Sequence, residues 1–247
     1  MKELALRLKS PRVVWLMVPA GRPVDEVLQA LTPFLQKGDI VVDGGNSFYK
    51  DSLRRGAKLA RRGISFLDVG VSGGPVSIRA GKFAIMVGGN KRVYTKVRPL
   101  LNDLSDTQAG YMGKSGAGHF AKMVHNGIEY GMMQALAEGF AILKKAPFRF
   151  RLQDVAKVYN SNSIVTSRLV GWLEEGFRIY GEDLKKASNK VSHTGEGEWT
   201  VKTAKQLKVP VPVISEAFKF RVRSAKEPSF TGKILSTLRA VFGGHKI

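Results

Sequence analysis

The sequence contains no cysteine and no long uninterrupted run of apolar residues. The first absence excludes disulfide bonds and thiolate metal ligands, and it fits a cytoplasmic protein. The second argues against a membrane-spanning helix, which needs about 20 consecutive apolar residues. The opening stretch, MKELALRLKSPRVVW, is too charged for the apolar segment of a signal peptide. We therefore expect a globular cytoplasmic protein with no membrane partner.

Acidic residues are also scarce. The chain has 20 of them against 40 lysines and arginines, which gives a net charge of +20. Such an excess attracts nucleic acid, anionic membranes or phosphorylated small molecules. The basic residues are spread through the chain, however, and no nucleic-acid-binding motif accompanies them. We expect a generally basic surface without a nucleic-acid partner.

Hydrophobic periodicity divides the chain into two halves. Strand patterns occur at 12–19, 39–45, 64–74 and 82–89, and they alternate with helix patterns at 23–36, 49–63 and 91–104. Strands separated by such helices predict βαβ units and a parallel sheet. Strand signals then vanish, and helices are predicted at 117–145, 152–159, 163–179, 199–207, 212–223 and 229–241. The predicted fold class is α/β followed by all-α, with a parallel-sheet domain over 1–112 and a helical domain over 113–247.

Glycine-rich turns follow three of the predicted strands. They are VPAG at 18–21, DGGNS at 43–47 and VSGGP at 71–75. Ligands of open α/β sheets bind beyond the carboxyl ends of the strands. Glycine lets the backbone approach a ligand and leaves N–H groups free to bind oxygens. These turns predict a ligand site at that end of the sheet.

The stretch GAGHFA, residues 116–121, has the spacing of a dinucleotide-binding fingerprint. Such a fingerprint needs a strand directly before it. The preceding AGYMGKS is instead predicted to be a short polar connection. We expect these glycines to let the start of the helix pack closely against the sheet domain.

The predicted helix 117–145 carries a polar stripe. Lys122, His125, Asn126 and Glu129 fall within a sector of about 80°, with Tyr130 at its edge. A solvated face with an i,i+4 network is one interpretation. The surrounding apolar residues favour another, because buried ionisable groups are costly unless they are paired or used. A lysine and a glutamate held together in a cleft suit acid–base chemistry.

Four segments together resemble the 6-phosphogluconate dehydrogenases, in particular the shorter, frequently NAD-linked form. They are DGGNS, DVGVSGG, GAGHFAKMVHNGIEYGMMQ and the terminal RAVFGGH, and the similarity runs over residues 10–247. The resemblance implies a partial Rossmann-like domain followed by a helical substrate and dimerisation domain. It implies oxidative decarboxylation of 6-phosphogluconate to ribulose 5-phosphate and CO₂, with reduction of NAD or NADP and no required metal.

The resemblance also implies roles for individual residues. Lys122 is similar to the base that takes the C3 hydroxyl proton, and Glu129 to the acid that protonates C1. The implied substrate-binding residues are Asn46, Ser72, Gly73, Gly74, His125, Asn126, Tyr130, Lys190, Arg239 and His245. The implied cofactor-binding residues are Val18, Pro19, Ala20, Gly21 and Asn46. Arg239 and His245 match residues that reach into a neighbouring subunit's site, which implies a homo-oligomer.

One part of the family pattern is missing. The family begins with a strand, a G-x-G-x-x-G turn and a helix, and this chain starts about sixty residues later in that pattern. We therefore expect an unpaired sheet edge and impaired or absent cofactor binding. The alternative to an active dehydrogenase is a catalytically inactive remnant that binds sugar phosphates or other anions, or a basic interaction protein.

Overall fold

In the computed structural model, which describes residues 1–245, the chain divides into two compact units. One comprises residues 1–73 and 77–124, and the other comprises residues 74–76 and 125–247. The division falls within the long helix α6 (Ala117–Lys145), so this helix contributes to both units. The domain boundary at 112/113 stays a prediction. None of the described helices combines the length and apolar character that crossing a membrane requires.

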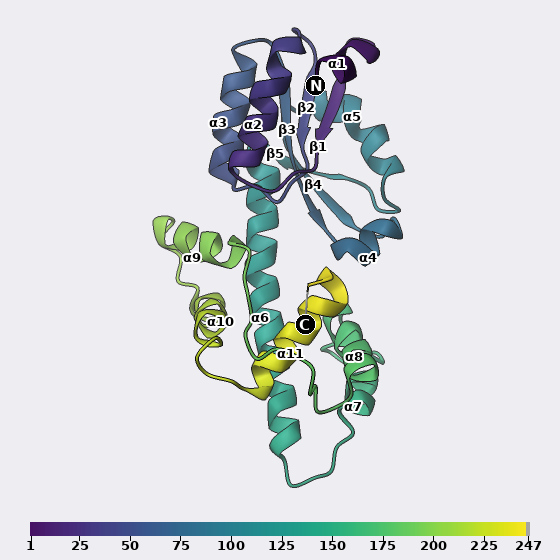
Figure 1. Cartoon of the computed structure of the whole chain (residues 1–247), viewed down its shortest axis with the longest axis vertical. Helices are drawn as coiled ribbons and strands as arrows, with labels where there is room; N and C mark the ends of the chain where they lie inside the picture. Colours follow the sequence, from purple (N-terminus) through teal and green to yellow (C-terminus); the bar gives the residue numbers. More distant parts are fainter. Residues whose placement is uncertain (246–247) are drawn as a thin grey trace. The chain divides into compact units, whose positions relative to one another are not determined.

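A five-stranded sheet forms the centre of the first unit (Figure 1). Its strands, in the order in which they pair, are β1 (Val13–Leu16), β2 (Ile40–Asp43), β3 (Ser65–Ser72), β4 (Ala84–Gly89) and β5 (Gly110–Gly113). All neighbouring pairs are parallel except β3–β4. The predicted fold class is confirmed. β1 pairs with β2 alone among the described strands and leaves the expected unpaired edge.

The antiparallel pair β3–β4 follows from the length of its connection. Residues 73–83 contain only the short helix α4 (Gly74–Arg79). A parallel return needs a crossover of a dozen or more residues, usually with a full helix. The chain therefore turns back beside β3 in the opposite direction.

Helices cover both faces of the sheet, as Figure 1 shows. The first unit contains α1 (Lys2–Arg7), α2 (Arg22–Leu31), the 3₁₀ turn η1 (Thr32–Phe34), α3 (Tyr49–Ala60) and α5 (Lys91–Asp103). Alternate residues of β2 face opposite ways. Val41 packs with α2 and α3, whereas Ile40 and Val42 pack with α5. Burial on both faces explains why this strand is continuously apolar.

Strand β5 lies directly before α6, where the sequence predicted only a polar connection. That prediction was wrong, because Gly110 and Gly113 weaken the strand signal while their backbone still pairs with β4. The predicted role of the glycines in residues 116–121 is confirmed. A Cβ on Gly118 would overlap the carbonyl oxygen of Asp68 and would lie 2.7 Å from that of Met86. The start of α6 can therefore approach the sheet only with glycine at this position.

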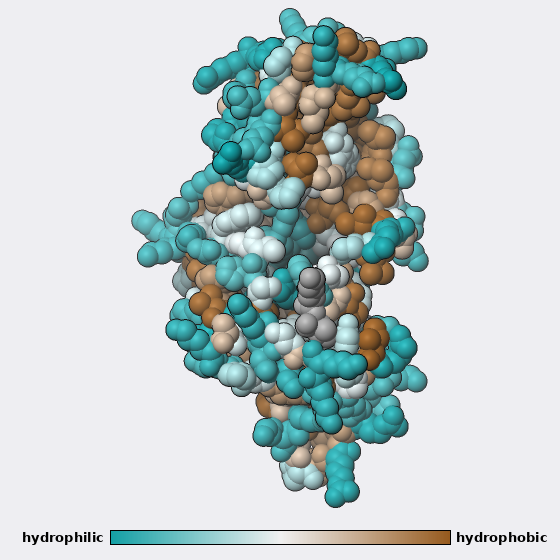
Figure 2. Space-filling model, viewed as in Figure 1, coloured by the Kyte–Doolittle hydropathy of each residue, from teal (hydrophilic) through white to brown (hydrophobic). Residues whose placement is uncertain are grey.

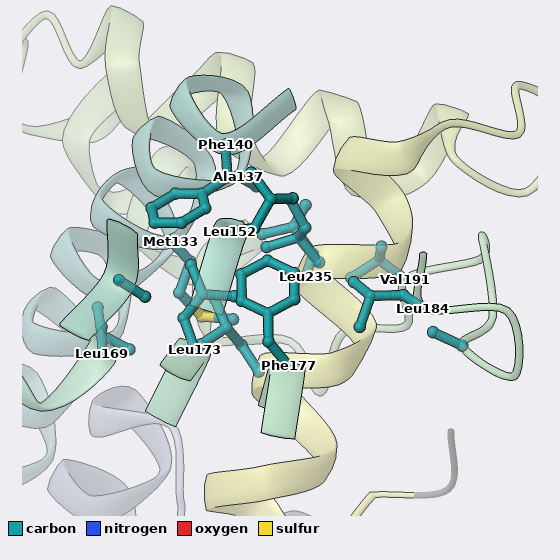
Figure 3. Packing of buried hydrophobic residues seen from close by; sticks show 14 residues of the cluster. Met133, Ala137, Phe140, Leu152, Leu169, Leu173, Phe177, Leu184, Val191 and Leu235 are labelled. Atoms are coloured by element: carbon teal, nitrogen blue, oxygen red, sulfur yellow. The ribbon is translucent and has the colours of Figure 1, made fainter. Parts of the chain in front are cut away.

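The second unit is helical. Besides its part of α6, it contains α7 (Leu152–Tyr159), α8 (Arg168–Tyr180), α9 (Glu196–Gln206), α10 (Pro212–Arg223) and α11 (Phe230–Gly243). Its core joins α6, α8 and α11, where Figure 3 shows Phe140, Phe177 and Leu235 turned toward one another. Helix α8 starts later than predicted, because Ser167 caps it by accepting a hydrogen bond from the Val170 N–H.

Hydrophilic side chains cover much of the face drawn in Figure 2. Brown hydrophobic patches interrupt them on that face. Several large apolar side chains are exposed, among them Leu6 on α1 and Met17 after β1. Both belong to the first unit, and Met17 follows directly on the edge strand.

Candidate active site

A cavity of about 320 Å³ lies where the first and second glycine turns meet in the first unit. It is lined by Met17, Val18, Pro19, Ala20, Gly44, Gly45, Asn46 and Val71. The structure therefore brings together four predicted cofactor-binding residues, Val18, Pro19, Ala20 and Asn46. The fifth, Gly21, is not in the lining and instead begins α2 with a φ of +85°.

The lining of this cavity suits a planar ring better than a phosphate group. None of the lining side chains is charged. The two turns touch closely, because a Cβ on Gly45 would lie 2.8 Å from the Val18 carbonyl oxygen. The cavity is at the small end of the range of about 300–1,000 Å³ for ligand pockets. It suits the nicotinamide end of a dinucleotide, and its lining supplies no cation for a pyrophosphate.

The third glycine turn leaves no space for side chains. Ser72 ends β3 and is half-buried. A Cβ on Gly73 would lie 2.6 Å from the Cβ of Phe83. Gly74 has a φ of +69°, and a Cβ there would overlap the carbonyl oxygen of Phe242. Ser72, Gly73 and Gly74 thus form a turn whose glycines expose backbone rather than side chains.

Lys122 is held against β3 within the first unit and is 9% exposed. Its stem packs on Gly70, where an added Cβ would collide with the lysine Cβ. Asp68, on the same strand, accepts hydrogen bonds from the backbone N–H groups of Gly116 at 2.7 Å and His119 at 2.9 Å. A carboxylate at a helix start satisfies free N–H groups and is favoured by the helix dipole. Strand β3 therefore fixes both the helix and the lysine on it.

The rest of the polar stripe lies on α6 within the second unit. His125 Nδ1 is 3.0 Å from Asn126 Oδ1 and 3.8 Å from Glu129 Oε2. The His125 and Glu129 side chains are 41% and 24% exposed. These three residues therefore form a neighbouring polar group, and their partly exposed side chains leave it accessible to a ligand.

Tyr130 occupies the centre of a buried cluster in the second unit. The guanidinium of Arg221 stacks on its ring, with Cζ 3.4 Å from the ring centroid. On another side the backbone of α9 packs against the ring, since a Cβ on Gly197 would overlap it. Burial raises the pKa of Tyr130, so its hydroxyl stays protonated at neutral pH.

Arg239 and His245 belong to the same unit. Arg239 donates to Ser192 Oγ and faces His245 Nε2 at 3.4 Å. Burial lowers the pKa of His245, and the charge of Arg239 lowers it further, so this imidazole is neutral at pH 7. The two residues thus lie in the unit that holds Tyr130 of their own chain. Their reach into a neighbouring subunit stays a prediction.

Arg221 is a residue of this cluster that the sequence analysis missed. It is 4% exposed, and its recorded hydrogen bond goes to Met133 Sδ at 3.4 Å. Among residues 1–245, no carboxylate lies within salt-bridge distance of Arg221. Burial lowers the pKa of its guanidinium, an effect that reflects the cost of a poorly compensated charge. An anionic ligand can relieve that cost.

The sequence pattern did not distinguish Arg221 from its basic neighbours, and burial on α10 revealed it. It lies four residues after Ala217 on α10, and both are buried, so the arginine occupies the inward face of the helix. A cation on such a face is unusual. Lys190, which was predicted instead, has an exposed side chain and accepts a hydrogen bond from Ser236 Oγ through its backbone carbonyl. In the described part of the chain, no cluster of His, Asp or Glu is arranged as a metal site.

Comparisons with known proteins agree for both halves of the chain. Residues 1–126 match the family described as the NAD binding domain of 6-phosphogluconate dehydrogenase. Residues 118–238 match the family described as the 6-phosphogluconate dehydrogenase C-terminal domain. The chain is 44% identical to Bacillus subtilis YqeC, named as a candidate 6-phosphogluconate dehydrogenase, over 99% of this chain and 82% of that protein.

Two further relatives are also 6-phosphogluconate dehydrogenases. An NAD(+)-dependent, decarboxylating 6-phosphogluconate dehydrogenase of Haloferax volcanii is 39% identical over 99% of this chain and 81% of its own length. The solved structure of Plasmodium falciparum 6-phosphogluconate dehydrogenase superposes with a TM-score of 0.81 at 32% identity and covers 90% of this chain. The chain spans only 50% of that Plasmodium chain. On these matches, the chain belongs to the 6-phosphogluconate dehydrogenase family.

Proposed function

We propose that the chain catalyses the oxidative decarboxylation of 6-phosphogluconate to ribulose 5-phosphate and CO₂ with NAD or NADP. The observation that carries this proposal is the series of ionisable and polar groups along α6. Lys122 is buried against β3, Asn126 and Glu129 are half-buried, and Tyr130 is buried under Arg221. Such a series supplies proton transfer and phosphate binding along one helix.

The nicotinamide ring, when bound, supplies the hydride acceptor. Val18, Pro19 and Ala20 would hold it through the apolar wall and backbone of the cavity, and Asn46 would face both ring and substrate. The chain's part in this step is to exclude water from the reacting carbon and to fix its orientation.

Lys122 would accept the proton of the C3 hydroxyl while the C3 hydride leaves. The product is a β-keto acid, and the lysine ammonium then donates a hydrogen bond to the new C3 carbonyl oxygen. The C1 carboxylate leaves as CO₂, and the electrons of its bond to C2 form a C2–C3 enediol as Lys122 returns its proton to the C3 oxygen. Glu129 would then donate a proton to the former C2, which is C1 of ribulose 5-phosphate, while Lys122 takes back the proton of the C3 hydroxyl.

The remaining residues would bind the substrate. Tyr130, Arg221 and Arg239 suit the phosphate, because guanidinium groups match its oxygens in two-bond contacts. His125 and Asn126 suit the sugar hydroxyls. The turn at Ser72, Gly73 and Gly74 suits the carboxylate end through its backbone N–H groups.

The test is production of NAD(P)H from 6-phosphogluconate by the wild-type chain and by two lysine variants. Lys122→Met should lower kcat by about 10²-fold or more, because the proton acceptor is lost. Lys145→Met, at the exposed end of the same helix, is the matched control and should leave the rate unchanged. Full activity in Lys122→Met would refute the assigned role.

A second candidate is an inactive protein that binds sugar phosphates. The uncharged lining of the cavity supports it, since no lining residue can neutralise a pyrophosphate. This candidate predicts thermal stabilisation by 6-phosphogluconate without turnover in the presence of either cofactor. Tight binding in an NAD or NADP titration would contradict it and the expected impairment. The cytoplasmic location and the homo-oligomer stay predictions.

A further inference from the structure

Arg55 of α3 connects the two turns that line the cavity. It is 2% exposed, although it lies outside the predicted site. Its Nη2 donates to the carbonyl oxygen of Gly21 at 2.9 Å, at the end of the turn after β1. Its Nη1 lies 3.3 Å from Asp43 Oδ2 and from Ser47 Oγ, on the turn after β2. One guanidinium is therefore hydrogen-bonded to residues of both the first and the second glycine turn.

The Asp43 carboxylate continues this connection into the second turn. Its Oδ1 accepts the backbone N–H of Gly45 at 3.2 Å, and its Oδ2 accepts the hydroxyl of Ser47 at 2.9 Å. Asp43 is completely buried, so its charge depends on Arg55 for compensation. Gly44 and Gly45 give the turn little stiffness of their own. The position of Asn46 therefore depends on bonds made by residues on both sides of it.

The bonds also orient Arg55 itself. Its Nε lies 3.0 Å from Asp25 Oδ1 and its Nη2 lies 3.3 Å from Oδ2, a two-bond contact with the helix that follows the first turn. A planar guanidinium with such a contact has little freedom to rotate. The N–H groups of the Arg55 guanidinium are all used, because two carboxylates, a carbonyl and a hydroxyl accept from them. None of these N–H groups is left to bind a ligand.

We propose that Arg55 is a positioning residue for the cofactor cavity, which sets the spacing between the turns at 18–21 and 43–47. The inference rests on the proposed function, because it assigns the nicotinamide to that cavity. Arg55 touches neither cofactor nor substrate and acts through Gly21 and Asp43. A change at Arg55 should therefore weaken cofactor binding and leave proton transfer at Lys122 unaffected.

Arg54 offers a matched control one position away. It also binds Asp25, with Nη2 2.8 Å from Oδ2, but its side chain is 54% exposed and does not reach the second turn. Arg55→Lys and Arg54→Lys both keep the charge and both lose a guanidinium contact with Asp25. Only Arg55→Lys loses the connection between the turns, because one ammonium cannot reach Gly21, Asp25 and Asp43 together.

The first experiment measures the second turn without any ligand. Trp15 packs against Gly44, and an added Cβ there would lie 2.7 Å from the indole Cε2. In the 247-residue chain with Trp172→Phe and Trp199→Phe, Trp15 is the remaining tryptophan. We expect Arg55→Lys to increase acrylamide quenching of Trp15 well below its unfolding temperature, and Arg54→Lys to leave it unchanged. Equal quenching in both variants would overturn the proposal.

The second experiment separates binding from chemistry. Arg55→Lys should raise the KM for NAD or NADP by about tenfold, while kcat stays within about threefold of wild type. A loss of kcat with an unchanged cofactor KM would overturn the proposal. If Arg55→Lys does not fold, Asp25→Asn replaces it, since this change removes the charge that orients Arg55 from a partly exposed position. A wild-type chain without turnover would refute the proposed function, and Trp15 quenching would still decide the role of Arg55.

Discussion

Arg55 and Arg221 are both buried arginines, one in each unit, and they are held in opposite ways. Arg55 is 2% exposed and is bonded to Asp25 and Asp43. Arg221 is 4% exposed, its guanidinium stacks on Tyr130, and among the residues described that guanidinium is hydrogen-bonded only to a sulfur. A saturated charge holds chain segments in place, whereas an unsaturated one can bind an anion. Burial alone therefore does not identify a ligand-binding arginine, and the partner groups do.

The largest contrast should appear in stability. Arg55→Met leaves the buried Asp43 carboxylate without its ion pair, which should lower the free energy of unfolding by about 3–5 kcal/mol. Arg221→Met removes a charge that has no carboxylate partner, so its unfolding free energy should be unchanged or higher. Urea unfolding of both variants measures this difference. Equal losses would show that the two arginines play the same structural part.

The next contrast concerns phosphate binding. Arg221→Met should raise the dissociation constant for 6-phosphogluconate by about 30-fold or more, because a buried guanidinium is lost from a charged contact. The exposed Arg223 lies on the same helix, and Arg223→Met is the matched control. Thermal stabilisation by 6-phosphogluconate measures both. An unchanged response in Arg221→Met would remove this arginine from the proposed site.

A smaller effect should come from Tyr130→Phe. The ring stays in place under Arg221, and only the hydroxyl is lost. Because burial raises the pKa of Tyr130, the hydroxyl is a neutral hydrogen-bond partner, and its loss should weaken 6-phosphogluconate binding by about tenfold or less. Isothermal titration checks this value. A loss as large as that of Arg221→Met would mean that the hydroxyl, and not the guanidinium, dominates the contact.

The smallest effect should be a loss of folding stability at acidic pH that depends on Asp25. Burial by itself would raise the pKa of Asp25, but hydrogen bonds from Arg55 and Arg54 together lower it from 3.8 to about 2. A carboxyl group with a lowered pKa in the folded state stabilises the protein above its unfolded pKa and loses this effect as pH falls. Stability should therefore decline between about pH 4 and pH 2. In Asp25→Asn this part of the pH dependence should be reduced, as measured by urea unfolding at several pH values.

Much of the fold could be predicted from local pattern. β2 is apolar at each position before Asp43 because both of its faces are covered, and α6 is a helix throughout its predicted range. β5 could not be predicted, since Gly110 and Gly113 carry no strand propensity and the strand exists through backbone pairing with β4. The direction of β4 was also missed, because it follows from the length of a connection.

The candidate site also contains residues that the sequence predicted and residues that only the structure revealed. The residues on α6 have a periodicity that is visible in the sequence, and the residues that line the cavity lie at or just beyond the ends of predicted strands. Arg221 and Arg55 were missed, because the sequence places both among other basic residues on basic helices. Only packing distinguishes Arg55 from Arg54, and Arg221 from Arg223.

The sequence by itself determined the order of the strands and helices other than β5, α1 and α4, together with the polar stripe on α6 and the glycine turns, because these depend on residue spacing and backbone freedom. The tertiary structure decided which charges are saturated. The acceptors of Arg55 come from residues 21, 25, 43 and 47, and the ring under Arg221 comes from residue 130. Such partners are distant in sequence, and hydrogen bonds depend on distances of about 3 Å that only the folded chain sets.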